Sequence, residues 1–164
     1  MKLKVGDVIF FKAEDTWISK LIAKLTKSPY THVGLAISEN KIMEANRFVN
    51  TRIIPFEFDE KQHVLYRPQG IDDTIKEKIF SQALVYHKYP YDYLQIVGWL
   101  FRLLFNWKQG NLFNRANHLI CSELIDYTFY YAGVKRKGTI ALGDVTPPML
   151  LDVYDLKKVR GEDK

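Results

Sequence analysis

Three side chains of this 164-residue chain have the chemistry of an activated nucleophile. Cys121 is the only cysteine, and His32 and Glu44 lie far before it in the sequence. A thiol attacks carbonyl carbon as its thiolate, so it needs a base that takes its proton. Imidazole serves as that base when a carboxylate holds its other nitrogen. These residue types therefore suit acyl transfer or hydrolysis through a covalent thioester.

Cys121 lies at the start of a predicted helix that ends at Ala132 and Gly133, because glycine commonly terminates helices. The apolar residues of this segment repeat at helical spacing: Ile120, Leu124, Tyr127 and Tyr131. The first N–H groups of a helix favour an anion and can stabilise an oxyanion. A lone cysteine among apolar residues is by itself more typical of a buried core side chain. The assignment of Cys121 as a nucleophile therefore depends on its partners.

His32 and Glu44 lie on the two strands of a predicted hairpin, residues 32–38 and 41–45. We predict a three-residue loop that ends in Asn40, a residue that tolerates the left-handed conformation such loops require. The hairpin should therefore hold the two side chains at a fixed relative position.

This loop would pair Ile37 with Lys41 and set Glu44 opposite Gly34, on the same face as His32 and diagonal to it. Diagonal neighbours are roughly 7–8 Å apart, within reach of two long side chains. A slip of one residue would move Glu44 to the other face. The sequence thus predicts that the His32 ring lies between the Cys121 sulfur and the Glu44 carboxylate.

Other residues offer alternatives or additions to this site. His118 lies three residues before Cys121 but has no acidic neighbour to orient it, so we favour His32 as the base. Tyr30, Tyr91 and Tyr93 are candidates for lining a substrate cleft, since a phenol combines apolar area with a polar tip. Core packing would account for each tyrosine equally well.

Composition restricts the function classes. Hydrophobic residues make up 47% and charged residues 26%, as in an ordinary folded domain. The net charge of +5 is scattered, and no nucleic-acid-binding motif accompanies it, so we expect no nucleic-acid partner. The four histidines show no ligand spacing, so we expect no metal and no other cofactor. The apolar opening is interrupted by Asp7 and lacks a cleavage site, which predicts no signal peptide and a cytoplasmic location.

The most hydrophobic run covers residues 93–107 and is interrupted by Gln95 and Arg102. It is too short to span a bilayer. We interpret it as a core helix, with peripheral membrane contact as the alternative. The oligomeric state stays open.

The remaining pattern predicts one domain over residues 1–164, without repeats or linkers. Further predicted strands cover residues 6–11, 51–58 and 62–68, and further predicted helices cover residues 16–25 and 71–89. Because strands come first and helices follow, we expect an α+β fold with an antiparallel sheet.

Several fragments, in their order, carry a resemblance to a known family. "GDVIFF", "THVGLAI", "MEA", "YPYDY" and "CSEL" resemble the permuted, YiiX-like branch of the NlpC-type papain-fold cysteine peptidases, over roughly residues 5 to 150. The resemblance implies a circularly permuted papain-like fold, with an antiparallel sheet or half-barrel packed against helices. It also implies Cys121 as nucleophile, His32 as base and Glu44 as the group that orients the base.

The function that this resemblance implies is a cysteine amidase or peptidase that cleaves a small peptide-like amide, such as a cell-wall peptide. The permuted branch is also similar to lecithin:retinol acyltransferase and related lipid enzymes. A lipid-directed acyl hydrolase or acyltransferase with the same three residues is therefore the first alternative. A noncatalytic binding module is the second.

Overall fold

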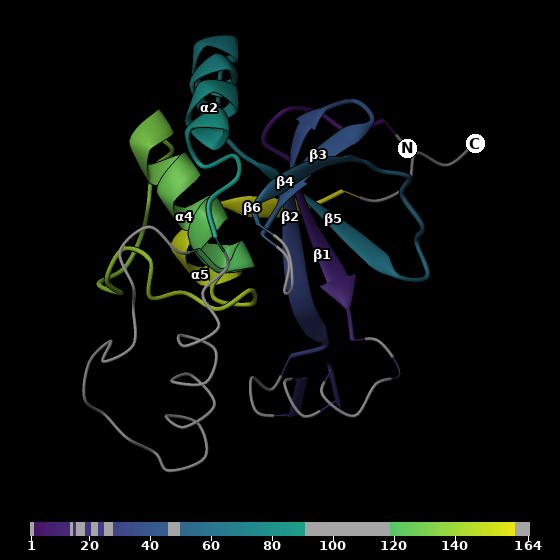
Figure 1. Ribbon diagram of the computed structural model, residues 1–164. Helices are drawn as coiled ribbons and strands as arrows, with labels where there is room; N and C mark the ends of the chain where they lie inside the picture. The colour runs from purple at the N-terminus through teal and green to yellow at the C-terminus, as the bar shows by residue number, and fades with distance from the viewer. Residues whose placement is uncertain are drawn as a thin grey trace.

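The computed structural model describes residues 2–13, 15, 19–20, 23–24, 28–45, 50–90 and 119–159. Six strands form one sheet, in which every neighbouring pair is antiparallel (Figure 1). Their order across the sheet is β4-β3-β2-β1-β5-β6. The strands are β1 (Val8–Lys12), β2 (Tyr30–Ser38), β3 (Lys41–Glu44), β4 (Arg52–Pro55), β5 (His63–Pro68) and β6 (Leu156–Lys158). The predicted α+β class with an antiparallel sheet is confirmed.

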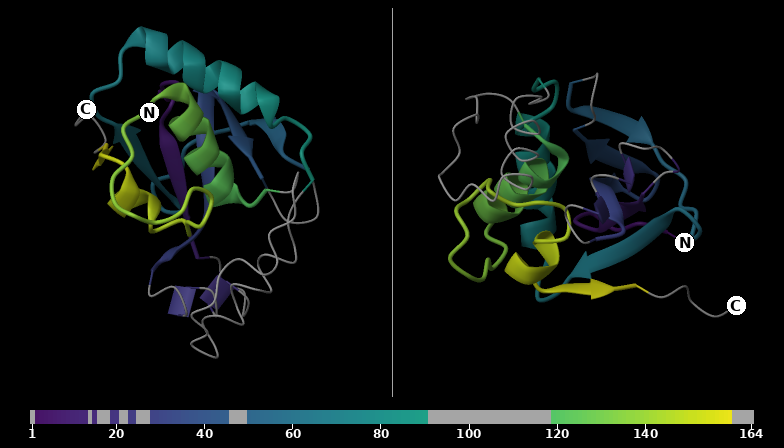
Figure 2. Two further views of the ribbon diagram at one scale, coloured as in Figure 1. Left: turned by 90° about the vertical axis from the view of Figure 1, so that its left-hand side faces the viewer. Right: turned by 90° about the horizontal axis from the view of Figure 1, so that it is seen from below.

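Three described helices lie on one side of this sheet, as the right-hand view of Figure 2 shows. They are α2 (Asp73–Val85), α4 (Cys121–Ala132) and α5 (Leu150–Val153). The main core lies between them and the sheet, where buried residues of the strands and helices form one cluster: Val8, Phe10, Val33, Leu35, Met43, Ile79, Ala83, Leu124, Ile125 and Phe129. Burial of this apolar area is the main force that holds α4 on β2.

The other face of the sheet is covered by residues of strands and their connections. Ile9, Ala36, Ile42 and Leu65 form a second buried cluster, against which Phe56 and Phe58 pack. The connection from β4 to β5 must cross this face, because three strands separate β4 from β5 in the sheet. Both faces are therefore apolar, and the sheet is a buried layer.

The β2–β3 hairpin differs from the prediction in its loop. Ser38 pairs with Lys41, so the loop has two residues, and the register shifts between Ala36 and Ser38. Among the described residues other than glycine, only Lys88 has a positive φ, so Asn40 does not adopt the predicted left-handed conformation. The extra residue of the predicted loop is instead taken up as a β-bulge, which changes the register by one position.

The bulge gives the inner part of the hairpin the register that the longer loop was expected to give. Leu35 pairs with Met43, which sets Gly34 opposite Glu44 one position further along. A methyl group at Gly34 would lie 3.0 Å from Cδ1 of Ile42, so this position is also crowded.

The start of α2 and the end of α4 are both capped, and the end of α4 at Gly133 is the one that the sequence predicts. The Asp72 side chain accepts a hydrogen bond of 2.8 Å from the Ile75 amide and so caps α2. Gly133 ends α4 with a φ of 88° in the left-handed region. A side chain there would be strained, which is the reason for glycine at this position.

A buried polar network holds the middle of α4. The Asp126 carboxylate is fully buried and accepts bonds from the Arg136 guanidinium, the Tyr154 hydroxyl and the Gly143 amide. The guanidinium also donates to the carbonyl oxygens of Ile140 and Ala141. α4 is therefore tied to the segment that leads into α5 and β6.

Two predicted elements cannot be compared in full. The helix over residues 16–25 and the helix over residues 93–107 lie wholly or mostly outside the described residues. β6 was not predicted, because three residues are too few to show a strand period.

Candidate active site

Cys121 is the first residue of α4 and is 6% exposed. The Ile120 backbone precedes the helix in an extended conformation, and its amide donates a 3.0 Å bond to the Glu123 carboxylate, which folds back over the helix start. This bond occupies the Ile120 amide, and the Cys121 amide is the next N–H along the chain.

His32, on β2, forms a hydrogen bond of 2.9 Å between its Nε2 and Oε2 of Glu44, on β3. The His32 side chain is 20% exposed and the Glu44 side chain only 4%. The bulged hairpin register accounts for this contact, because it puts the two residues on one face. Nδ1 is therefore the His32 nitrogen that remains for a second partner.

The Cys121 side chain is the other group that acts on the His32 ring. Burial alone would lower the pKa of His32, but the charge and hydrogen bond of Cys121, and then those of Glu44, outweigh it and raise that pKa to about 10. Both neighbours, the sulfur and the carboxylate, therefore favour the protonated form of the imidazole. The structure thus brings together the three residues that the sequence singled out.

Arg52 completes the polar set, and sequence reasoning missed it. It pairs with Glu44 across β3 and β4, and its Nε and Nη2 donate bonds of 3.0 and 2.8 Å to Glu44 Oε1. Each Glu44 oxygen thus binds a different cation. An Arg at the start of the strand after Glu44 was the available signal, since opposite charges favour cross-strand pairing.

The other predicted site residues have different outcomes. Tyr30 lies at the start of β2, where its ring packs edge-on against Phe10 and its hydroxyl is 3.5 Å from that of Tyr66. Tyr91, Tyr93 and His118 lie outside the described residues, as does the run over residues 93–107. In the described part of the chain, no helix has the length and hydrophobicity of a membrane span.

Comparisons with known proteins add the fold family. No protein-family model matches the sequence, and a search of curated proteins finds no significant match. A crystal structure from Escherichia coli O157:H7, described as the metalloprotein YiiX (DUF1105), is similar over 99% of both chains, with a TM-score of 0.66 and 18% sequence identity. The fold is YiiX-like. At this identity, the likeness to YiiX concerns the arrangement of strands and helices.

Proposed function

We propose that this protein is a cysteine hydrolase that cleaves a peptide-like amide through a thioester on Cys121. The observation that carries the proposal is the position of the His32 ring, bonded to Glu44 through Nε2 and interacting with Cys121. A cysteine beside an imidazole that a carboxylate holds is the arrangement of an activated cysteine nucleophile.

The proposed reaction has two steps. The Cys121 sulfur attacks the amide carbon, and the His32 proton passes to the leaving nitrogen as the C–N bond breaks. Water then attacks the thioester while His32 takes a proton from it, and the Cys121 sulfur leaves. The Cys121 N–H is the proposed donor to the oxyanion of both tetrahedral intermediates.

Glu44 and Arg52 act in this scheme as positioning residues. Glu44 fixes the tautomer and orientation of the His32 ring, as the third member of a catalytic triad does. Arg52 holds the other Glu44 oxygen, so the carboxylate has little freedom to rotate.

The same features support a permuted papain-like fold. Such folds combine a cysteine at a helix start with a histidine on an antiparallel sheet. Here the histidine and the acidic residue precede the cysteine in the chain, which is the order of the permuted, NlpC-type branch.

No step of the proposed reaction involves a metal. The solved YiiX structure is described as that of a metalloprotein. In this chain, the described residues contain no group of three or more His, Cys, Asp or Glu side chains that could hold a metal ion. The described part of the chain therefore offers no metal site, and we assign the proposed chemistry to the thiol and the imidazole.

Labelling with iodoacetamide tests the nucleophile, and a substrate screen tests the reaction. We expect Cys121 to react in the folded protein, and we expect His32→Ala to slow the reaction by about a hundredfold or more, the lower end of the range for loss of a general base. His87→Ala is the matched control, since His87 is exposed on the segment after α2.

The screen compares cell-wall peptides with acyl lipids as substrates. Turnover of a peptide amide that is lost in Cys121→Ala supports the proposal, and turnover of acyl lipids alone would favour a lipid-directed acyl hydrolase. Labelling only after denaturation, or turnover that survives Cys121→Ala, would overturn it.

A further inference from the structure

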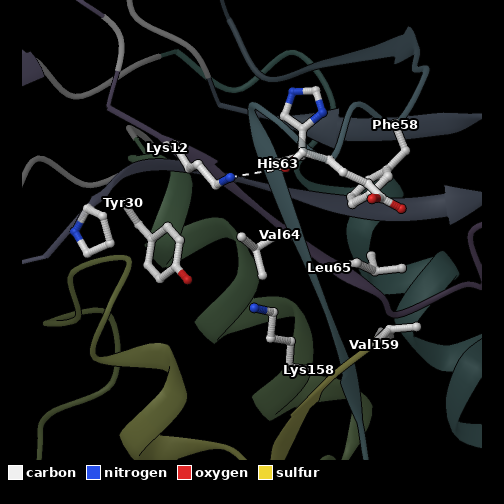
Figure 3. A pocket seen from close by; sticks show the side chains of 10 residues that line it. Lys12, Tyr30, Phe58, His63, Val64, Leu65, Lys158 and Val159 are labelled. Atoms are coloured by element: carbon white, nitrogen blue, oxygen red, sulfur yellow. Dashed lines mark hydrogen bonds between the residues drawn. The ribbon is translucent and has the colours of Figure 1, made fainter. Parts of the chain in front are cut away.

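A pocket of about 400 Å³ opens where β1, β2, β5 and β6 come together (Figure 3). This volume lies in the range of small-molecule sites. Its described lining combines charged or polar groups with apolar side chains: Lys12, Pro29, Tyr30, Phe58, Glu60, His63, Val64, Leu65, Lys158 and Val159. The pocket is not explained by the three residues of the proposed reaction.

Two lysines in this lining have no acidic partner among the residues that the structure describes. Lys12 donates bonds of 3.0 and 2.9 Å to the carbonyl oxygens of Glu60 and Lys61, which fix its amine in place without neutralising it. Within the described part of the chain, no carboxylate forms an ion pair with Lys12 or with Lys158. The pocket is therefore lined by two positive charges that no carboxylate of the described residues neutralises by direct contact.

A third donor lies beside them. Figure 3 shows the Tyr30 hydroxyl and the amines of Lys12 and Lys158 around the side chain of Val64. Burial, and then the neighbouring Tyr66, raise the pKa of Tyr30 to about 12, so the hydroxyl keeps its proton and can donate it. An anion at this end would meet two ammonium groups and one phenol.

The rest of the lining limits the charge and the shape of the ligand. Glu60 also lines the pocket, so the lysines and this carboxylate together carry one net positive charge, which suits a monoanion better than a phosphate dianion. In Figure 3, Phe58, Leu65 and Val159 lie on the opposite side from Tyr30. Phe58 and Val159 are partly exposed and offer an apolar surface for a short side chain, whereas Leu65, against which they pack, is fully buried.

We propose that this pocket binds the free carboxylate end of an apolar amino acid or short peptide. The inference rests on the proposed function, because it makes the pocket the subsite for the carboxyl-terminal end of a peptide-like substrate. The two sites are neighbours in the sheet, because Tyr30 lines the pocket and lies two residues before His32 on β2. The Phe11 ring contacts both the His32 ring and the ring of His63, which also lines the pocket.

Equilibrium binding of two matched probes tests this proposal without turnover. N-acetyl-L-leucine and N-acetyl-L-leucinamide differ only in having a carboxylate or a neutral amide, and titration calorimetry on Cys121→Ala protein measures both. We expect the carboxylate probe to bind about fivefold more tightly, or more, as for an ionic contact of about 1 kcal/mol. The preference should weaken as salt is added.

Lys158→Gln should reduce this preference to less than about twofold, because it removes one of the two ammonium groups. Lys157→Gln is the matched control: it makes the same charge change on the neighbouring residue of β6, which does not line the pocket. Equal binding of the two probes, or equal effects of the two lysine changes, would overturn the assignment.

The outcome separates this inference from the proposed function. If the pocket prefers the carboxylate probe but Cys121 of the wild-type protein does not react, the pocket assignment holds and the hydrolase proposal fails. If Cys121 reacts but the pocket does not prefer the carboxylate probe, the hydrolase proposal holds and the pocket assignment fails.

Discussion

Replacing Glu44 with Gln should lower the pKa of His32 and slow the reaction of Cys121. Glu44 Oε2 lies 2.9 Å from His32 Nε2, and the Glu44 side chain is only 4% exposed, so water screens this contact little. Glutamine keeps the shape and one carbonyl oxygen, but it removes the negative charge that faces the imidazolium.

The expected size of the effect follows from the contact. A hydrogen bond to a charged group contributes about 1.5–3 kcal/mol, against about 1 kcal/mol for a neutral one, so the imidazolium should lose about 0.5–2 kcal/mol. This corresponds to roughly a tenfold fall in the protonation constant of His32. The cost in global stability should be only about 1 kcal/mol, because Arg52 is 43% exposed and water can hydrate it once its partner is neutral.

Titration of the His32 ring protons by NMR measures this change directly. The wild-type midpoint should lie near pH 10, and the Glu44→Gln midpoint clearly below it. Glu39→Gln, in the exposed loop of the same hairpin, is the control and should leave the midpoint where it is. Iodoacetamide labelling of Cys121 at pH 7 should slow in parallel. Equal midpoints in wild type and Glu44→Gln would refute the role of Glu44 in holding the imidazolium.

Four further outcomes follow. The pKa of His32 rises from 6.5 to about 10 on folding, so its contribution to stability is complete below pH 6.5 and is lost as the pH rises through 10. Urea unfolding from pH 6 to 10.5 should show this decline in stability, and His32→Gln should abolish the decline. Asp126→Ala should cost about 3–5 kcal/mol in urea unfolding, since it leaves the Arg136 guanidinium, 12% exposed, without its carboxylate; a cost below about 1 kcal/mol would contradict the buried network. Gly133→Ala should cost about 1–2 kcal/mol in thermal unfolding because of its φ of 88°, and an unchanged midpoint would speak against that conformation. Turnover should be the same with and without EDTA, since the proposed reaction uses no metal; activity lost to EDTA and restored by Zn²⁺ would contradict the mechanism.

Local patterns predicted most of the elements that surround the site. The helix that starts at Cys121 and ends at Gly133 follows from apolar spacing and a glycine, both of which act within one segment. The hairpin strands follow in the same way from branched residues on either side of a polar turn. These features depend on neighbours in the sequence, so a single sequence contains them.

The details that escaped prediction depend on contacts between distant segments or on backbone geometry. The bulge in the hairpin replaced a longer loop with the same register, and sequence does not distinguish two ways of accommodating one residue. Arg52 was missed because its role exists only once β4 pairs with β3. The lysines of the pocket come from strands at opposite ends of the chain, β1 and β6, and only the folded sheet brings them together.

The spacing of the three site residues along the chain sets the order in which the site can assemble. His32 and Glu44 are 12 positions apart and join through a hairpin, an event that takes about microseconds in isolated peptides. Cys121 reaches them only when α4 docks on β2, which closes a much longer stretch of chain and costs more conformational entropy. A histidine–carboxylate pair should therefore exist early in folding, while the thiol reaches the imidazole last. Activation of Cys121 would then report completed folding, and partly folded chains would carry a cysteine without its partner.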